Sequence, residues 1–132
     1  MAIDYGGKRV GIAVSESGIL ASPHSVVPND DRLLARIASI ADEISAETLV
    51  VGLPRRARTS AGEQKFREFA ERLRQKTCKP VVLWDETLST VEAAEQLRAG
   101  GRKRSKGTED IDMYAAAVIL QSYLDARPGR PS

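Results

Sequence analysis

The fold of this chain is decided by the stretch Ala2-Ile3-Asp4-Tyr5-Gly6-Gly7-Lys8-Arg9-Val10-Gly11-Ile12-Ala13-Val14. Two short apolar runs, Ala2–Tyr5 and Val10–Val14, flank a Gly-Gly-Lys-Arg tip, which is typical of a tight antiparallel hairpin. We expect the two glycines to supply the positive φ that such a turn requires. The chain therefore opens with two paired strands.

Asp4 stands out within the first of these strands, because its neighbours indicate a buried central strand. An ionised carboxylate there costs several kcal/mol unless something compensates its charge, and a cation is the obvious compensator. The structural alternative is that Asp4 accepts hydrogen bonds from the turn amides of Gly6 and Gly7. The hairpin alone leaves both interpretations open.

Length and composition indicate one globular domain. The chain has 132 residues, of which 42% are hydrophobic and 29% charged, and its net charge of +2 does not by itself imply a nucleic-acid partner. No run approaches the roughly 18 apolar residues of a membrane span, and no signal sequence opens the chain, so we expect a cytoplasmic protein. A single cysteine, Cys78, excludes an internal disulfide and a Cys-based zinc site, and a single histidine, His24, leaves little for His-centred catalysis or soft-metal binding. Any bound metal ion should therefore have oxygen ligands.

The next patterns predict a mixed α/β sheet. Residues 19–27 continue the hairpin as a third strand, in which Pro23 indicates an edge or bulged position. A helix is expected over residues 31–45, with Asn29 or Asp30 as its cap. A strand, a crossover helix and a parallel strand form a right-handed unit, so this helix is expected to lead back to the sheet.

The apolar run at residues 47–54 is typical of a buried parallel strand, and it leads into a loop rich in arginine. The three arginines are Arg55, Arg56 and Arg58. Ser60 and Glu63 have capping-box spacing, which predicts a helix to about residue 77 with a core stripe. That stripe comprises Phe66, Phe69, Ala70 and Leu73. Arginines beside a helix N-terminus at the carboxyl end of a parallel strand are placed to bind phosphate, although a solvated loop is the alternative.

Two adjacent acids, Asp85 and Glu86, follow the strand predicted at residues 79–84. The pair Ser89 and Glu92 already caps the next helix, so neither acid is needed for that purpose. Side chains alternate along a strand, so only one of the two acids can face a cleft, and position alone does not choose between them.

A basic loop and a final helix complete the chain. The segment 98–106 carries five positive charges in nine residues. The last helix is predicted over residues 109–125, with Asp112 about one turn before the apolar Ala116. Asp112 is therefore expected to face the protein interior, with a helix-dipole interaction as the alternative. Residues 126–132 lack an apolar pattern and are expected to be disordered.

Four motifs in order resemble those of the YqgF (RuvX) family of pre-16S rRNA nucleases and RuvC-like Holliday junction resolvases. They are Asp4-Tyr5-Gly6-x-Lys8-Arg9, Val50-Val51-Gly52-Leu53-Pro54, Asp85-Glu86-x-Leu88-Ser89-Thr90, and Asp112 preceding Ala116-Ala117-Val118-Ile119-Leu120. The resemblance implies a ribonuclease H-like α/β fold, with a mixed five-stranded sheet between helices on both faces, in a single domain at residues 1–125. Gly7, Thr87 and Arg55–Arg58 depart from the usual family pattern.

By this resemblance Asp4, Glu86 and Asp112 are the catalytic acids, which selects Glu86 over Asp85. Three converging carboxylates repel one another, and Mg²⁺ or Mn²⁺ relieves that repulsion through oxygen coordination. We expect two ions, with Asp4 bridging them and each remaining acid completing one site.

The expected function is a metal-dependent nuclease that processes the 5′ end of pre-16S rRNA in ribosome biogenesis. The alternatives are a Holliday junction resolvase or DNA repair nuclease, and a non-catalytic nucleic-acid-binding regulator of the same fold. A sugar kinase or actin-like ATPase is disfavoured, because the chain has no second lobe.

RNA or branched or single-stranded DNA is the expected partner, with a ribosomal precursor particle as a further candidate, and monomer and homodimer both remain open. Phosphate contacts are expected from the cations of the hairpin tip and the two basic loops. These cations are Lys8, Arg9, Arg56, Arg58, Arg102, Lys103, Arg104 and Lys106. Tyr5, Trp84 and Tyr123 are expected to pack in the core.

Overall fold

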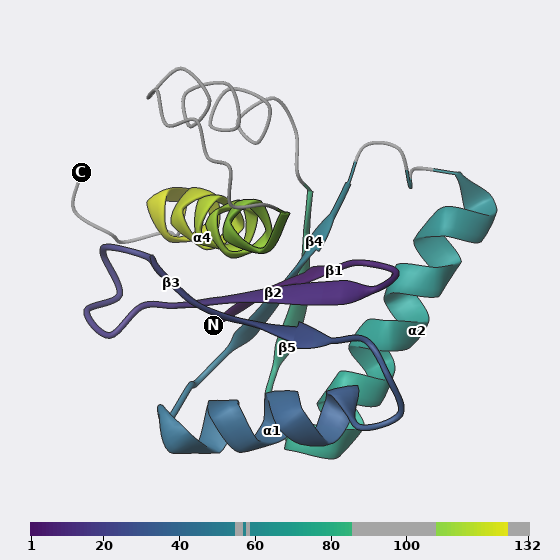
Figure 1. Ribbon diagram of the computed structural model, residues 1–132, viewed down its shortest axis with the longest axis horizontal. Coiled ribbons are helices and arrows are strands. Elements are labelled where there is room, and N and C mark those ends of the chain that lie inside the picture. Colours follow the sequence, from purple (N-terminus) through teal and green to yellow (C-terminus); the bar gives the residue numbers. More distant parts are fainter. Residues whose placement is uncertain (55–56, 58, 86–107, 127–132) are drawn as a thin grey trace.

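The computed structural model is a five-stranded mixed sheet with helices on both faces, as predicted (Figure 1). It describes residues 1–54, 57, 59–85 and 108–126, with the backbone alone for residues 108–112. The elements are β1 (Ala2–Tyr5), β2 (Arg9–Val14), β3 (Ser22–Pro28), α1 (Leu33–Glu43), β4 (Leu49–Leu53), α2 (Ser60–Thr77), β5 (Val81–Asp85) and α4 (Thr108–Ala126). Within these ranges, no helix is both long and apolar enough to cross a membrane.

The central strand is β1, in a sheet of order β3-β2-β1-β4-β5. It pairs antiparallel with β2 and parallel with β4, where Ile3 lies opposite Val51. β5 extends the parallel part of the sheet, with Leu53 opposite Asp85. Because β1, β4 and β5 run in one direction, they end at the same end of the sheet, which we call the carboxyl end.

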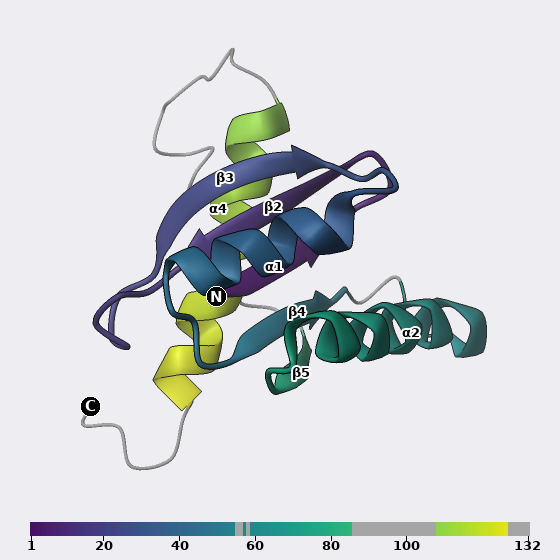
Figure 2. The ribbon, with the colours of Figure 1, turned by 90° about the horizontal axis from the view of Figure 1, so that it is seen from below.

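Side chains alternate between two hydrophobic layers on the two faces of the sheet. Ile3 and Leu83 belong to the layer under α1 and α2, whereas Ala2, Val50 and Trp84 belong to the layer under α4. Figure 2 shows α1 and α2 side by side on the near face, with α4 behind the sheet. The face that a strand residue takes therefore determines which helices it meets.

The aromatic side chains pack within these layers, as predicted. The Tyr5 ring stacks on Phe69, with 3.9 Å between the ring centroids, and meets Phe66 edge-on at 5.5 Å. On the other face Trp84 meets Tyr123 edge-on at 5.4 Å. The predicted apolar stripe of α2 is buried in the layer under α1 and α2. These contacts hold α2 and α4 against opposite faces of β1 and β5.

The predicted third strand starts too early. β3 begins at Ser22, and the preceding Ile19 and Leu20 are exposed in the β2–β3 loop, where the Ser17 hydroxyl accepts hydrogen bonds from both of their N–H groups. These local bonds shape a turn instead of a strand. The prediction of an edge or bulged position for Pro23 is confirmed, because β3 is an edge strand and its register shifts between Ile12 and Ala13.

The predicted helix caps are also shifted. α1 begins at Leu33 after the N-cap Arg32, which makes no side-chain capping bond. α2 is capped by Thr59 and not by Ser60, and the Thr59 hydroxyl accepts the Gly62 N–H at 3.0 Å. At the other end of the chain, Ala126 ends α4 and does not begin the predicted tail, whose residues 127–132 lie outside the described ones.

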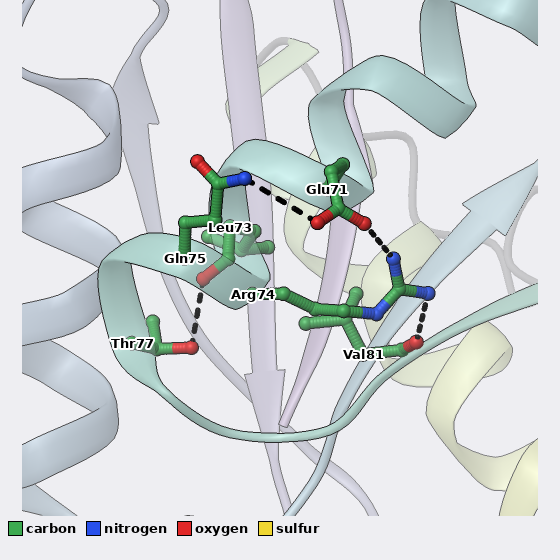
Figure 3. A network of polar contacts seen from close by, with 6 residues as sticks. All are labelled: Glu71, Leu73, Arg74, Gln75, Thr77 and Val81. Atoms are coloured by element: carbon green, nitrogen blue, oxygen red, sulfur yellow. Dashed lines mark hydrogen bonds and ion pairs between the residues drawn. The ribbon is translucent and has the colours of Figure 1, made fainter.

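The C-terminal end of α2 is tied to the start of β5 (Figure 3). The Arg74 guanidinium donates to the Glu71 carboxylate at 2.7 Å and to the Val81 carbonyl at 2.9 Å. The chain then turns through Cys78, which has a left-handed φ of 58° and donates its N–H to the Arg74 carbonyl. This network fixes the start of the strand that carries Asp85 to the carboxyl end.

The β1–β2 turn contradicts the prediction of positive φ at Gly6 and Gly7. Among the described glycines, positive φ occurs at Gly18 alone. Gly6 is needed for a different reason, since a Cβ at this position would lie 2.5 Å from the Arg9 carbonyl oxygen. A Cβ at Gly7 would meet nothing within 4 Å. The turn therefore requires glycine at position 6 but not at position 7.

We predict that Gly6→Ala lowers the free energy of unfolding by about 1–3 kcal/mol, because the added methyl group overlaps backbone that cannot move away freely. Gly7→Ala is the matched control and should change it by no more than about 0.5 kcal/mol. Urea denaturation of the two variants measures the difference. Equal midpoints for both variants would contradict this account of the turn.

Candidate active site

Asp4 lies on the α4 face of the central strand. Ile3 and Tyr5, on either side of it, pack in the layer under α1 and α2, and Ala2 packs under α4, so alternation places Asp4 on the α4 face. The Asp4 side chain is half-buried. Its partner in β2 is Gly11, which has no side chain to cover this position. A carboxylate is thus presented near the carboxyl end of β1, opposite a residue without a side chain.

Of the acid pair at the end of β5, the structure describes Asp85. Leu83 packs in the layer under α1 and α2, and Trp84 packs in the layer under α4. Alternation therefore returns Asp85, which is exposed, to the face opposite Asp4. Glu86 is the next residue and lies outside the described ones, so its place in the acidic triad stays a prediction.

Two hydrogen bonds show which end of α4 lies at the β2–β3 loop. Gln121 accepts the Ala21 N–H at 2.9 Å and donates to the Ile19 carbonyl at 2.8 Å, which holds the C-terminal half of α4 at the β2–β3 loop. Figure 1 shows the N-terminal end of α4 (green) toward the β1–β2 turn. Asp112 belongs to this N-terminal part, four residues before Ala116, which is fully buried. The Asp112 side chain lies outside the description, so its role also stays a prediction.

The described residues do not by themselves form a metal centre. Within them, no group of three or more His, Cys, Asp or Glu side chains is arranged to hold a metal ion. Asp4 is the one member of the predicted triad whose side chain is described. His24 is exposed on the edge strand, with Nδ1 2.8 Å from the Ser25 hydroxyl, and Cys78 is exposed beyond the far end of α2.

The cations predicted to bind phosphate are only partly described. Lys8 is exposed and Arg9 half-buried, and both lie at the β1–β2 turn at the carboxyl end. The others lie outside the described residues. They are Arg56, Arg58, Arg102, Lys103, Arg104 and Lys106.

Ala57, which the sequence pattern did not single out, is an anchor point among the arginines at residues 55–58. Ala57 is buried in the layer under α1 and α2, and its N–H donates to the Pro54 carbonyl at 2.9 Å. A Cβ at Gly62 would lie 2.6 Å from the Ala57 carbonyl oxygen, so the first turn of α2 closes directly on this anchor. Ala57 carries no chemical signal in the sequence beyond being the one small apolar residue among arginines.

We predict that Gly62→Ala lowers the free energy of unfolding by about 1–3 kcal/mol, because the new methyl group collides with the Ala57 backbone. The exposed neighbour supplies the control, and Ala61→Ser should leave the value within about 0.5 kcal/mol. Thermal and urea denaturation of both variants provide the measurement. An unchanged Gly62→Ala variant would show that the loop is not anchored at Ala57.

The sheet order, with helices on both faces, defines a ribonuclease H-like α/β fold. The solved structure of T. thermophilus RuvC in complex with a Holliday junction substrate is similar in fold, with a TM-score of 0.58 over 97% of this chain and 94% of that chain, at 19% sequence identity.

Sequence comparison then gives the family. The profile of the RuvX family, described as Holliday junction resolvase, matches residues 1–126. A protein of Geobacillus kaustophilus (strain HTA426) named "Putative pre-16S rRNA nuclease" is 41% identical, with 96% of this chain and 97% of that protein covered. A protein of the same name from Chloroflexus aurantiacus (strain ATCC 29366 / DSM 635 / J-10-fl) is 36% identical, with 100% and 90% covered. The chain belongs to the RuvX family, and by that membership it is a nuclease, as predicted.

Proposed function

We propose that this protein is a metal-dependent nuclease that processes the 5′ end of pre-16S rRNA in ribosome biogenesis, with Asp4, Glu86 and Asp112 as its acidic triad. The observation that carries the proposal is the placement of Asp4 on the α4 face of the central strand, near the end of the sheet where β5 also ends. The names of its relatives support the choice of RNA. A cytoplasmic location goes with this role.

The donor set of the proposed site fits Mg²⁺ or Mn²⁺. Asp4 offers carboxylate oxygens from a half-buried position, and both cations prefer oxygen ligands. We propose that Asp4, Glu86 and Asp112 would together hold two such ions. When bound, such ions lower the pKa of an attacking water and stabilise the leaving oxygen of a phosphodiester.

The residues of the chain would have two roles, which are holding the metal ions and contacting the phosphate backbone. The three carboxylates would hold the ions, and Asp4 lies opposite Gly11, which has no side chain, on the neighbouring strand. Cations of the β1–β2 turn and of the two basic loops contact the phosphate backbone. Contacts of this kind orient a nucleic acid without reading its bases, so they suit a substrate recognised by its structure.

Holliday junction resolution is the second candidate, favoured by the description of the RuvX profile and by the fold of T. thermophilus RuvC. Cutting both strands of a junction requires two active sites, and therefore a homodimer. A monomeric protein that cleaves precursor RNA and leaves junctions intact would decide for the first candidate. A protein that binds RNA but cleaves nothing would instead indicate a non-catalytic regulator.

We predict that Asp4→Asn and Glu86→Gln each reduce Mg²⁺- or Mn²⁺-dependent cleavage of a labelled pre-16S 5′ fragment by about 100-fold or more, because each removes a metal-binding charge. Asp85→Asn is the matched control, since Asp85 lies on the opposite face from Asp4, and it should keep activity within about threefold of the unmodified chain.

The assay compares unmodified and variant proteins on RNA and junction DNA, with EDTA as the metal-free condition. Melting temperatures verify that each variant is folded. Full cleavage by folded Asp4→Asn, or cleavage in EDTA, would refute the proposed chemistry. Loss of activity in Asp85→Asn with retention in Glu86→Gln would show that Asp85, and not Glu86, is the third acid of the triad.

We predict that Arg56→Ala and Arg102→Ala each weaken RNA binding and flatten the plot of log K against log salt concentration, by about 1 for each phosphate that is no longer neutralised. Arg67→Ala removes an exposed arginine in the middle of α2 and should leave the slope unchanged. Fluorescence anisotropy at several salt concentrations measures the slopes. Identical slopes for all three variants would show that neither basic loop contacts the RNA phosphates.

A further inference from the structure

Asn29 is a residue that the sequence pattern assigned to helix capping, but it holds the β1–β2 turn. β3 ends at Pro28, opposite Arg9, and Asn29 follows directly. Its backbone N–H donates to the Lys8 carbonyl at 2.9 Å, and its side-chain Nδ2 donates to the Gly6 carbonyl at 2.6 Å. One residue therefore binds the carbonyls on both sides of Gly7.

The backbone next to Asn29 is itself held at the start of α1. The Asp30 carbonyl accepts the Leu33 N–H at 3.0 Å, and its carboxylate accepts the Arg32 N–H at 3.0 Å and the Arg36 guanidinium at 2.5 Å. The hydrogen bond from Arg36 holds the pKa of Asp30 below its usual value, so this carboxylate stays charged near neutral pH. Asn29 thus reaches the turn from a segment fixed between an edge strand and a helix.

Residues of the hairpin itself also restrict the position of the β1–β2 turn. Tyr5, the last residue of β1, stacks on Phe69 of α2. The space above Gly6 is closed by the Arg9 carbonyl, which leaves no room for a Cβ. Hairpin tips are ordinarily mobile, so two further hydrogen bonds to a tip that is already packed indicate that its position matters.

Lys8 is what this turn presents to solvent. Its side chain is exposed and makes no ion pair within the described part of the chain. It lies at the carboxyl end of the sheet, four residues after Asp4 in sequence. Asn29 is uncharged and uses its amide as a donor, so it holds the turn without adding a carboxylate that would compete with phosphate for Lys8.

We propose that Asn29 is a positioning residue for substrate binding: by holding the Gly6 and Lys8 carbonyls, it keeps Lys8 in place to contact the phosphate backbone of the nucleic acid beside Asp4. The inference rests on the proposed nuclease function and adds the residue that preorganises one of its phosphate contacts. A preorganised cation loses less conformational freedom on binding, and this difference appears in affinity and not in the chemical step.

The test measures binding of a labelled 20-nucleotide RNA by fluorescence anisotropy in the Asp4→Asn background, together with cleavage in the otherwise unmodified protein. Asn29→Ala should weaken binding about threefold to tenfold and raise KM by the same factor, with kcat within about twofold. Asp30→Ala is the comparison variant, because it removes the side-chain bonds to Arg32 and Arg36 but keeps the backbone bond to Leu33 and both hydrogen bonds of Asn29. Its loss of affinity should therefore be clearly smaller than that of Asn29→Ala.

A double-mutant cycle separates positioning from a merely structural role. Asn29 acts through Lys8, so adding Asn29→Ala to Lys8→Ala should weaken binding by less than about 1.5-fold beyond Lys8→Ala alone. Asn29→Gln keeps the amide donor and should recover part of the affinity, which also provides a folded variant if Asn29→Ala unfolds.

Several outcomes would overturn the inference. They are unchanged affinity in Asn29→Ala, full additivity with Lys8→Ala, and an equal loss in Asp30→Ala. If the unmodified protein cleaves no nucleic acid with Mg²⁺ or Mn²⁺, the proposed function fails, while the binding cycle still decides whether Asn29 positions Lys8.

Discussion

The register of β1 between β2 and β4 is the constraint on which the rest of the structure depends. It places Ile3 and Tyr5 in the layer under α1 and α2, and Asp4 on the α4 face. A slip of one residue would exchange these faces and bring a carboxylate against Phe69, in place of the stacked Tyr5 ring. The hydrophobic alternation that folds the sheet is therefore the same pattern that presents the candidate catalytic acid.

Much of this architecture could be predicted from the sequence, because periodicity reports burial. The Gly-Gly hairpin, the apolar run of β4 and the helical stripe of α2 each carry a pattern that permits one arrangement. The residues at which helices and strands begin and end were harder to predict from the sequence. Ser60 and Thr59 are both good capping residues, and the structure uses Thr59, whose hydroxyl accepts the N–H of Gly62 where that glycine lies against the Ala57 backbone, a contact that no local pattern encodes.

The candidate site divides in the same way. Residue type and a family resemblance predicted the acids, whereas a physical argument about the face of Asp85 required knowing which face of the sheet Trp84 takes. The structure gives that face, since Trp84 packs with Tyr123 under α4. The role of Asn29 could not be predicted, because its partners, Gly6 and Lys8, are distant in sequence and are met through their carbonyls, which any residue possesses.

The proposed chemistry requires the acids at positions 4, 86 and 112 to converge on divalent cations. The most direct measurement is a crystal structure of the unmodified protein grown with Mn²⁺, with the metal located by its anomalous scattering. The account predicts Mn²⁺ on the α4 face at the carboxyl end of the sheet, coordinated by oxygens of Asp4, Glu86 and Asp112. Mn²⁺ absent from Asp4 at millimolar concentration, or any of the three carboxylates turned to the opposite face, would contradict it.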